Sequence, residues 1–301
     1  MTEFADRILK GDRRAIARAA TLVENRAATP LLRDLFPHTG KALVIGVTGA
    51  PGAGKSTLTN QLAIALRKEQ KTVAIIAVDP TSPYSGGAIL GDRIRMLQHH
   101  ADPGVFIRSM ATRGHLGGLA PAAADMTTLF DAAGCDVIIV ETVGVGQDEV
   151  EIARLADVTL VVVTPNTGDD IQALKAGLME IADVFLLNKS DLAGADKLER
   201  ELNASFTLSH RPDGWVPLVI RTVAAEGRGI DDALAAVRTY QATGLSTTKR
   251  GGVWAIRLRE MLRERLLERY DPMVFERAAQ AVIEHKTDPY TIIEDLLSNG
   301  S

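Results

Sequence analysis

The sequence predicts an α/β fold in which a mostly parallel sheet is covered by helices on both faces. Three observations support this prediction. Several short runs consist almost entirely of Val, Ile and Leu, as strands buried on both faces do. Segments with helical spacing of apolar residues separate these runs. Residues 49–56 read GAPGAGKS, a G-x-x-x-x-G-K-S string between a predicted strand and a predicted helix.

Residues 1–38 predict a helical N-terminal extension. Apolar residues recur at helical spacing from Glu3 to Arg26, and the pattern breaks near Gly11-Asp12, where Asp12 is a suitable N-cap.

Residues 39–244 hold the alternation of strands and helices and form the predicted main domain. We expect its strands at residues 42–47, 72–78, 105–108, 136–140, 157–163, 183–187 and 216–220. We expect its helices at residues 56–67, 92–100, 119–133, 147–155, 169–181 and 230–240.

Residues 245–301 predict a helical C-terminal extension. The stretch 244–252 (GLSTTKRGG) is polar and flanked by glycine, so we predict a linker there. Helices are expected at 253–269, 272–285 and 290–297, and the first of them carries an apolar stripe that includes Trp254. Such a stripe either packs on the chain's own sheet or builds a homodimer.

The composition limits the classes of function that this chain can have. A formal charge of −4 over 301 residues gives no global attraction to nucleic acid or to anionic membranes. Cys135, the only cysteine, begins an apolar run and is expected in the core. No apolar run approaches the roughly 20 residues that span a bilayer, and the first thirty residues lack the apolar region of a secretory signal. We therefore expect a cytoplasmic protein.

The glycine-rich string has the form of a phosphate loop. The strand, the glycine turn and the helix N-terminus together present a row of backbone N–H groups to an anion. Lys55 is expected to reach the β- and γ-phosphates, and the Ser56 hydroxyl to bind Mg²⁺. These features predict a P-loop NTPase. The expected phosphate-binding residues are Gly49, Ala50, Pro51, Gly52, Ala53, Gly54, Lys55, Ser56 and Thr57.

The sequence Asn188-Lys189-Ser190-Asp191 follows the predicted strand 183–187 directly and predicts guanine selectivity. A carboxylate at Asp191 can accept hydrogen bonds from both N1–H and the N2 amine of guanine, whereas adenine offers no such pair of donors. The Lys189 stem can lie along the plane of the base. The competing interpretation is that Asp191 caps the next helix.

Three acidic residues are candidates for the metal side. Asp79 and Glu141 end predicted strands, and Asp92 lies in a glycine-rich stretch. Mg²⁺ usually takes one or two carboxylates besides phosphate and water, so at most two of the three coordinate it directly. The predicted metal-binding residues are thus Ser56, Asp79, Asp92 and Glu141, and each carboxylate could instead cap a helix.

The segment Glu141-Thr142-Val143-Gly144 has the form of a loop that senses the γ-phosphate, with the Gly144 N–H as donor. Many GTPases place a water-orienting Gln after this glycine, but here the residue is Val145. We therefore predict slow intrinsic hydrolysis, helped by Gln147, a nearby carboxylate or a partner. The predicted catalytic residues are Lys55, Asp92, Glu141, Gly144 and Gln147.

Taken together, these residues resemble the MeaB-type GTPases, which are associated with methylmalonyl-CoA mutase. The resemblance is nearly end to end and includes the phosphate loop, NKSD and the following segments: 11–24, 79–96, 106–118, 140–147, 168–183 and 288–297. It implies a homodimer formed by the C-terminal helices, GTP or GDP and Mg²⁺ as ligands, and an adenosylcobalamin-dependent acyl-CoA mutase as partner. GTP hydrolysis would gate cofactor loading and protect the mutase.

The resemblance also implies three switch segments, 79–92, 141–147 and 164–177. This chain departs from the family pattern at two points. The third switch contains Pro165-Asn166 where Pro-Gly is common, and the base-binding loop reads Val223-Ala224-Ala225 where Ser-Ala is usual. The Ala224 N–H is expected to donate to guanine O6, but a side-chain hydroxyl is lost.

Two other classes of protein, a kinase and a metal-insertion GTPase, fit the sequence less well. A small-molecule kinase on the same scaffold would need an acceptor pocket and would have no reason to carry NKSD. A nickel-insertion GTPase would need clustered His or Cys, but the adjacent His99 and His100 diverge by roughly 100° on a helix.

Overall fold

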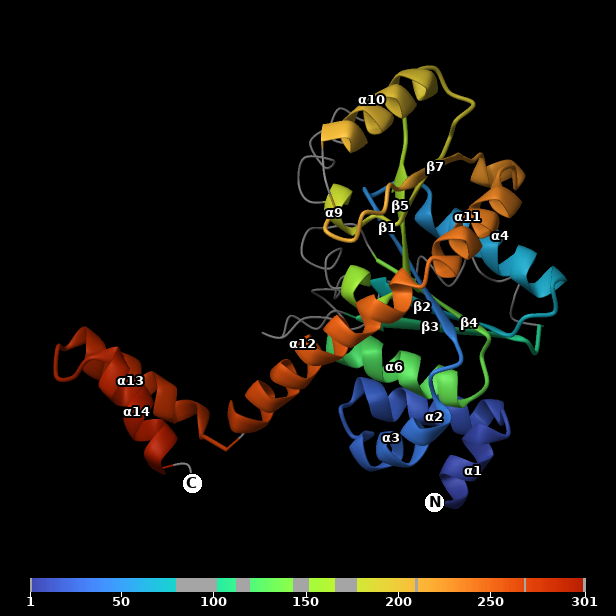
Figure 1. The fold of residues 1–301 in the computed structure, drawn as a ribbon. Helices are drawn as coiled ribbons and strands as arrows, with labels where there is room; N and C mark the ends of the chain where they lie inside the picture. The colour runs from blue at the N-terminus through green and yellow to red at the C-terminus, as the bar shows by residue number, and fades with distance from the viewer. Residues whose placement is uncertain are drawn as a thin grey trace. The chain divides into compact units, whose positions relative to one another are not determined.

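The computed structural model describes residues 2–79, 102–111, 120–142, 152–165, 178–208, 211–267 and 269–299. The chain divides into two compact units, Met1–Gly251 and Gly252–Ser301. Figure 1 shows the elements of each unit.

A seven-stranded sheet in the order β3-β2-β4-β1-β5-β6-β7 forms the centre of the first unit, within the described ranges. Every pairing between neighbouring strands is parallel. The strands are β1 (Leu43–Gly49), β2 (Val73–Asp79), β3 (Val105–Ala111), β4 (Val137–Glu141), β5 (Val158–Val163), β6 (Val184–Leu187) and β7 (Leu218–Arg221). The predicted parallel sheet is therefore confirmed, and each predicted strand is present to within a few residues of its expected bounds.

Helices cover both faces of this sheet, and side chains along each strand alternate between the two layers. On β5, Leu160 and Val162 face one layer, whereas Val161 and Val163 face the other. The first layer consists of α4 (Lys55–Lys68) and α11 (Ile230–Ala242), which lie side by side in Figure 1. The second consists of α6 (Ala120–Ala132), α9 (Met179–Ile181) and α10 (Ala195–Leu208).

Helix α10 occupies a stretch to which the sequence analysis assigned no element. Its apolar residues Ala195, Leu198 and Leu202 are buried against β5 and β6 at helical spacing. The signal was therefore present in the sequence. The predicted helices at 92–100, 147–155 and 169–181 lie wholly or mostly outside the described residues.

The N-terminal helices α1 (Glu3–Leu9), α2 (Arg13–Glu24) and α3 (Thr29–Leu35) belong to the first unit, and a 3₁₀ turn, η1 (Phe36–His38), follows them. Helices α2 and α3 pack on α6. The Asp12 carboxylate accepts the Arg14 N–H at 2.9 Å, which confirms the predicted N-cap between α1 and α2. The Arg108 guanidinium of β3 pairs with Glu24 at 2.5 Å, so α2 is tied to the edge strand as well.

At the amino ends of the strands, aspartates bind the backbone of the neighbouring strand. Asp157 accepts the Val44 N–H at 2.9 Å, and Asp183 accepts the Thr159 N–H at 2.8 Å. Both carboxylates are almost fully buried, at 3% and 0% exposure, and each pairs with a cation from the start of α12 (Leu245–Leu267). Lys249 Nζ lies 3.0 Å from Asp183, and Arg250 Nη2 lies 2.6 Å from Asp157.

The linker predicted at 244–252 is therefore wrong, because a helix begins at Leu245 and runs through the stretch. The physical reason is that Lys249 and Arg250 neutralise two carboxylates buried in the sheet. A helix holds both side chains in place. Leaving the Asp157 carboxylate without Arg250 would cost several kcal/mol, whereas Asp183 also pairs with Arg211 at 3.1 Å.

Gly251 and Gly252 lie inside α12, and a Cβ at either position would meet nothing within 4 Å. Replacing each with alanine should stabilise the helix by about 1 kcal/mol, because glycine loses more backbone entropy than alanine does. Thermal unfolding followed by circular dichroism should show a higher midpoint for Gly251→Ala/Gly252→Ala. Gly46→Ala is the opposite control, since its Cβ would lie 2.6 Å from Ile152 Cγ2. A glycine-pair variant less stable than the parent would contradict this account.

In the second unit, α12 is followed by α13 (Pro272–Ile283) and α14 (Pro289–Asn299). Asp271 caps α13 by accepting the Met273 N–H at 2.9 Å, and the Tyr270 hydroxyl donates to the Leu296 carbonyl at 2.6 Å. Several large apolar side chains of the unit are exposed: Trp254, Leu258, Met261, Leu262, Leu266, Ile283, Ile293 and Leu297.

The core cysteine and the absence of a membrane span were both expected from the sequence. Cys135 is 2% exposed, which confirms its place in the core, and burial raises the pKa of its thiol to about 12. Within the described ranges, no helix combines the length and the apolar character that crossing a bilayer requires.

Candidate functional site

The phosphate loop connects the carboxyl end of β1 to the first turn of α4, as predicted. Gly54 is the N-cap of α4 and has φ of 95°, a conformation that L side chains rarely adopt. A Cβ at Gly49 would lie 2.2 Å from the Val162 carbonyl oxygen. Glycine at these two positions is therefore required by the backbone itself, and the helix N-terminus faces the loop.

Lys55 lies in the first turn of α4 and is only 6% exposed. Its ammonium group donates to the carbonyl oxygens of Gly49 at 2.7 Å and Ala50 at 3.0 Å. The side chain thus folds back over the loop, so the structure places its charge beside the predicted phosphate position.

The Asn188 side chain joins the NKSD segment, residues 188–191, to the phosphate loop. Its amide nitrogen donates to the Ala53 carbonyl at 2.8 Å. The neighbouring Lys189 ammonium donates to the Gly52 carbonyl at 3.1 Å. A Cβ on Gly54 would lie 2.4 Å from Asn188 Nδ2, so the two segments approach closely. The structure therefore brings together two motifs that are more than 130 residues apart in the sequence.

Asp191 is exposed, and within the described ranges no hydrogen bond or ion pair engages its carboxylate. Helix α10 begins only at Ala195, so Asp191 is not the residue that precedes it. The competing interpretation of Asp191 as a helix cap is wrong.

The Ala224 N–H has a partner within the protein. It donates to Asn188 Oδ1 at 3.0 Å, and the Thr222 hydroxyl donates to the same oxygen at 3.3 Å. A guanine O6 bound at Ala224 would have to share this N–H with Asn188. Val223 is 7% exposed, whereas Ala225 is exposed. In the structure, the Ala224 N–H of this loop is therefore already bonded to Asn188.

On the metal side, the Ser56 hydroxyl donates to Glu141 Oε1 at 2.5 Å, and Glu141 is 4% exposed. The hydroxyl and the carboxylate supply hard oxygen atoms, which are the ligands that Mg²⁺ prefers, so this pair fits the ion. Asp79 ends β2, but the structure gives no description of its side chain. The predicted residues Asp92, Gly144 and Gln147 lie outside the described residues.

Three threonines near the site were not predicted as site residues. Thr48 and Thr142 share a buried hydroxyl–hydroxyl hydrogen bond of 2.9 Å, and Thr222 supports Asn188. The sequence did contain a sign of them, because each is a polar residue at the end of an apolar strand. The carboxyl ends of parallel strands are where such sheets bind ligands.

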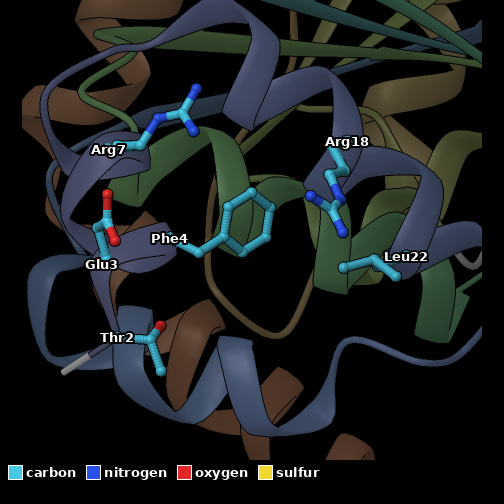
Figure 2. Close-up of a pocket in the computed structure, with 6 residues that line it drawn as sticks. All are labelled: Thr2, Glu3, Phe4, Arg7, Arg18 and Leu22. Atoms are coloured by element: carbon cyan, nitrogen blue, oxygen red, sulfur yellow. The ribbon is translucent and has the colours of Figure 1, made fainter.

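A separate hollow of about 450 Å³ lies on the N-terminal helices. Figure 2 shows Phe4 in its middle, with Arg18 and Leu22 on one side and Glu3 and Arg7 on the other. Arg18 lies 5.5 Å from the Phe4 ring centroid, and Arg7 pairs with Asp12 at 2.8 Å. The lining includes none of the predicted site residues, so this hollow plays no part in the nucleotide site.

The phosphate loop, the NKSD segment bonded to it and the Ser56–Glu141 pair indicate a nucleotide hydrolase. Residues 16–274 match the family model of the methylmalonyl-CoA mutase-associated GTPase MeaB. The chain belongs to this family. The predicted resemblance is confirmed, and the chain is a guanine-nucleotide-binding GTPase. Family membership favours this activity over the kinase and the nickel-insertion alternatives.

Known proteins support the assignment. The chain is 41% identical to GTPase ArgK of Escherichia coli over 260 residues, which cover 83% of this chain and 78% of the relative. It is 33% identical to the mitochondrial methylmalonic aciduria type A homolog of Mus musculus, over 89% of this chain and 71% of the relative. A crystal structure titled LAO/AO transport system kinase is 30% identical, with a TM-score of 0.73, and the match covers 98% of this chain and 96% of that chain.

Proposed function

We propose that this GTPase is a chaperone for an adenosylcobalamin-dependent acyl-CoA mutase, either methylmalonyl-CoA mutase or a close relative. GTP binding and hydrolysis gate the loading of adenosylcobalamin and protect the mutase. The observation that carries the proposal is the match of residues 16–274 to a family described as associated with that mutase. The hydrogen-bonded link between the phosphate loop and the NKSD segment supports the proposal, because such gating needs a nucleotide site.

In the proposed site, the chain's own groups bind and orient the nucleotide. Backbone N–H groups of the phosphate loop and the Lys55 ammonium hold the phosphates, and Asp191 accepts the two donors of guanine. Because the Asn188 and Lys189 side chains bond to the loop carbonyls, the base and the phosphates are held by one connected network. Pre-organised positioning and charge stabilisation supply most of the catalysis in phosphoryl transfer.

Ser56 and Glu141 would hold Mg²⁺, with Asp79 and Asp92 as further proposed carboxylates. When bound, the ion neutralises charge on the phosphates. Glu141 is buried beside the loop, so a cation there would also offset the desolvation of its carboxylate. Gly144 and Gln147 complete the proposed catalytic residues. Intrinsic hydrolysis is proposed to be slow, because Val145 cannot orient water.

The exposed apolar side chains of the second unit support a proposed homodimer in which a second copy covers this surface. Light scattering of the purified chain would measure its mass directly. We further propose a cytoplasmic location, with neither nucleic acid nor membrane as partner.

The partner role predicts a change in GTP turnover. The purified protein should hydrolyse GTP slowly, and adding the cognate mutase should change the rate several-fold, because partner contacts alter the positioning of catalytic groups. Phosphate release measures both rates. The Lys55→Ala variant mixed with the same mutase controls for contaminating hydrolases. If no candidate acyl-CoA mutase alters the rate, the chaperone role fails while the GTPase assignment stands.

A further inference from the structure

Thr48 and Thr142 form a buried polar pair at the edge of the nucleotide site. They are 0% and 2% exposed, and the Thr142 hydroxyl donates to the Thr48 hydroxyl at 2.9 Å. Thr48 directly precedes Gly49, the first residue of the phosphate loop, and Thr142 directly follows Glu141. The hydrogen bond therefore joins the two chain segments that carry the loop and the metal-side carboxylate.

This bond extends the pairing of two strands beyond its last step. The register of β1 and β4 ends at Val47 and Glu141, and the Thr142 N–H still donates to the Val47 carbonyl at 3.0 Å. The hydroxyl pair adds a side-chain bond just after that backbone bond. The hydroxyl pair thus links the two segments just beyond the last paired residues of β1 and β4.

Glu141 and Thr142 extend to opposite faces of the sheet, as successive residues of an extended chain do. The Glu141 carboxylate reaches Ser56 on α4, the helix of the first layer. Thr48 is on the opposite face, since it is paired in register with Val161, which faces the second layer. Glu141 is thus held on one side by Ser56, and the peptide that follows it is held on the other side by Thr48.

We propose that Thr48 and Thr142 are positioning residues that keep the Glu141 carboxylate in place beside Ser56 and thereby set the Mg²⁺ affinity of the nucleotide-bound protein. The proposal rests on the proposed role of Ser56 and Glu141 at the metal. Groups that orient metal ligands typically change metal affinity by about 10- to 100-fold when they are removed.

The double variant Thr48→Val/Thr142→Val separates positioning from folding. Valine has nearly the shape of threonine, and replacing both partners of a buried hydrogen bond by apolar groups is close to neutral. Each single valine variant leaves one buried hydroxyl without its partner and should be less stable. The double variant should therefore unfold near the parent's midpoint, which makes its binding properties interpretable.

The experiment measures binding of a fluorescent GDP analogue without Mg²⁺ and then titrates Mg²⁺. In the double variant we expect affinity without Mg²⁺ within about twofold of the parent, and a half-saturating Mg²⁺ concentration about tenfold higher. The single variant Thr142→Ser keeps the hydroxyl, so its half-saturating Mg²⁺ concentration should equal that of the parent. Thr127→Val is the matched control, because Thr127 is also buried and donates to the Ala124 carbonyl within α6.

The outcomes are distinguishable. A stable double variant with the parent's Mg²⁺ dependence overturns the positioning role and leaves the proposed function intact. A parent protein whose nucleotide binding ignores Mg²⁺ overturns the metal role of Ser56 and Glu141, and the positioning role with it. A Thr142→Ser variant that behaves like the double valine variant also contradicts the proposal, since the hydroxyl would then not be the acting group.

Discussion

Replacing Lys55 with alanine is expected to raise the dissociation constant for GTP by about a hundredfold or more, because removing one partner of a buried charge pair costs several kcal/mol. Lys55 is 6% exposed, and its ammonium already lies over the loop carbonyls at 2.7 and 3.0 Å. No other side chain of the loop itself carries a positive charge. Calorimetric titration with GTP measures the effect.

Lys68→Ala is the matched control for this prediction. Lys68 lies in the last turn of the same helix and is exposed, so its loss changes the net charge equally without touching the loop. Thermal unfolding of both variants establishes that they are folded. If Lys55→Ala binds GTP as tightly as Lys68→Ala does, the assignment of residues 49–56 as a phosphate loop is wrong.

Replacing Asp191 with asparagine is expected to move base preference from guanine toward xanthine. In the proposed site the carboxylate would accept from N1–H and the N2 amine of guanine, whereas an asparagine amide can donate to the oxygen that xanthine carries at C2. A site built around specific hydrogen bonds discriminates by several powers of ten when a partner is mismatched. We therefore expect GTP affinity to fall by about a hundredfold or more and the affinity for xanthosine triphosphate to rise.

Competition between the two nucleotides for the same protein measures this change in preference. Asp295→Asn removes an equivalent exposed charge from α14 and should leave the preference unchanged. Because Asp191 has no ion pair in the described ranges, its substitution should also leave the unfolding midpoint unchanged. If the Asp191→Asn variant prefers GTP over xanthosine triphosphate as strongly as the parent does, another group reads the base.

Much of the fold was predictable because the strands are buried on both faces. Such strands consist almost entirely of Val, Ile and Leu, so β4 and β5 are visible from composition alone. The phosphate loop was predictable because its requirement is local. Only glycine readily takes the φ of 95° at Gly54.

The linker prediction failed because the decisive interactions were distant. Locally, GLSTTKRGG is polar and rich in glycine, which is typical of a linker. The carboxylates that bind its lysine and arginine lie 66 and 93 residues away in the sequence. No window of neighbouring residues contains that information. The missed helix α10 is a different case, since its apolar spacing was present and unassigned.

The sequence by itself determined the family, the parallel sheet and the two nucleotide motifs, because glycine conformation, burial periodicity and short motifs are set by a few neighbouring residues. Only the tertiary structure decided how these parts connect. It placed Asn188 between the phosphate loop and Ala224, and it paired Thr48 with Thr142 across 94 residues. Such hydrogen bonds depend on strand register and on which face a side chain reaches, and these are fixed only when the whole sheet is assembled.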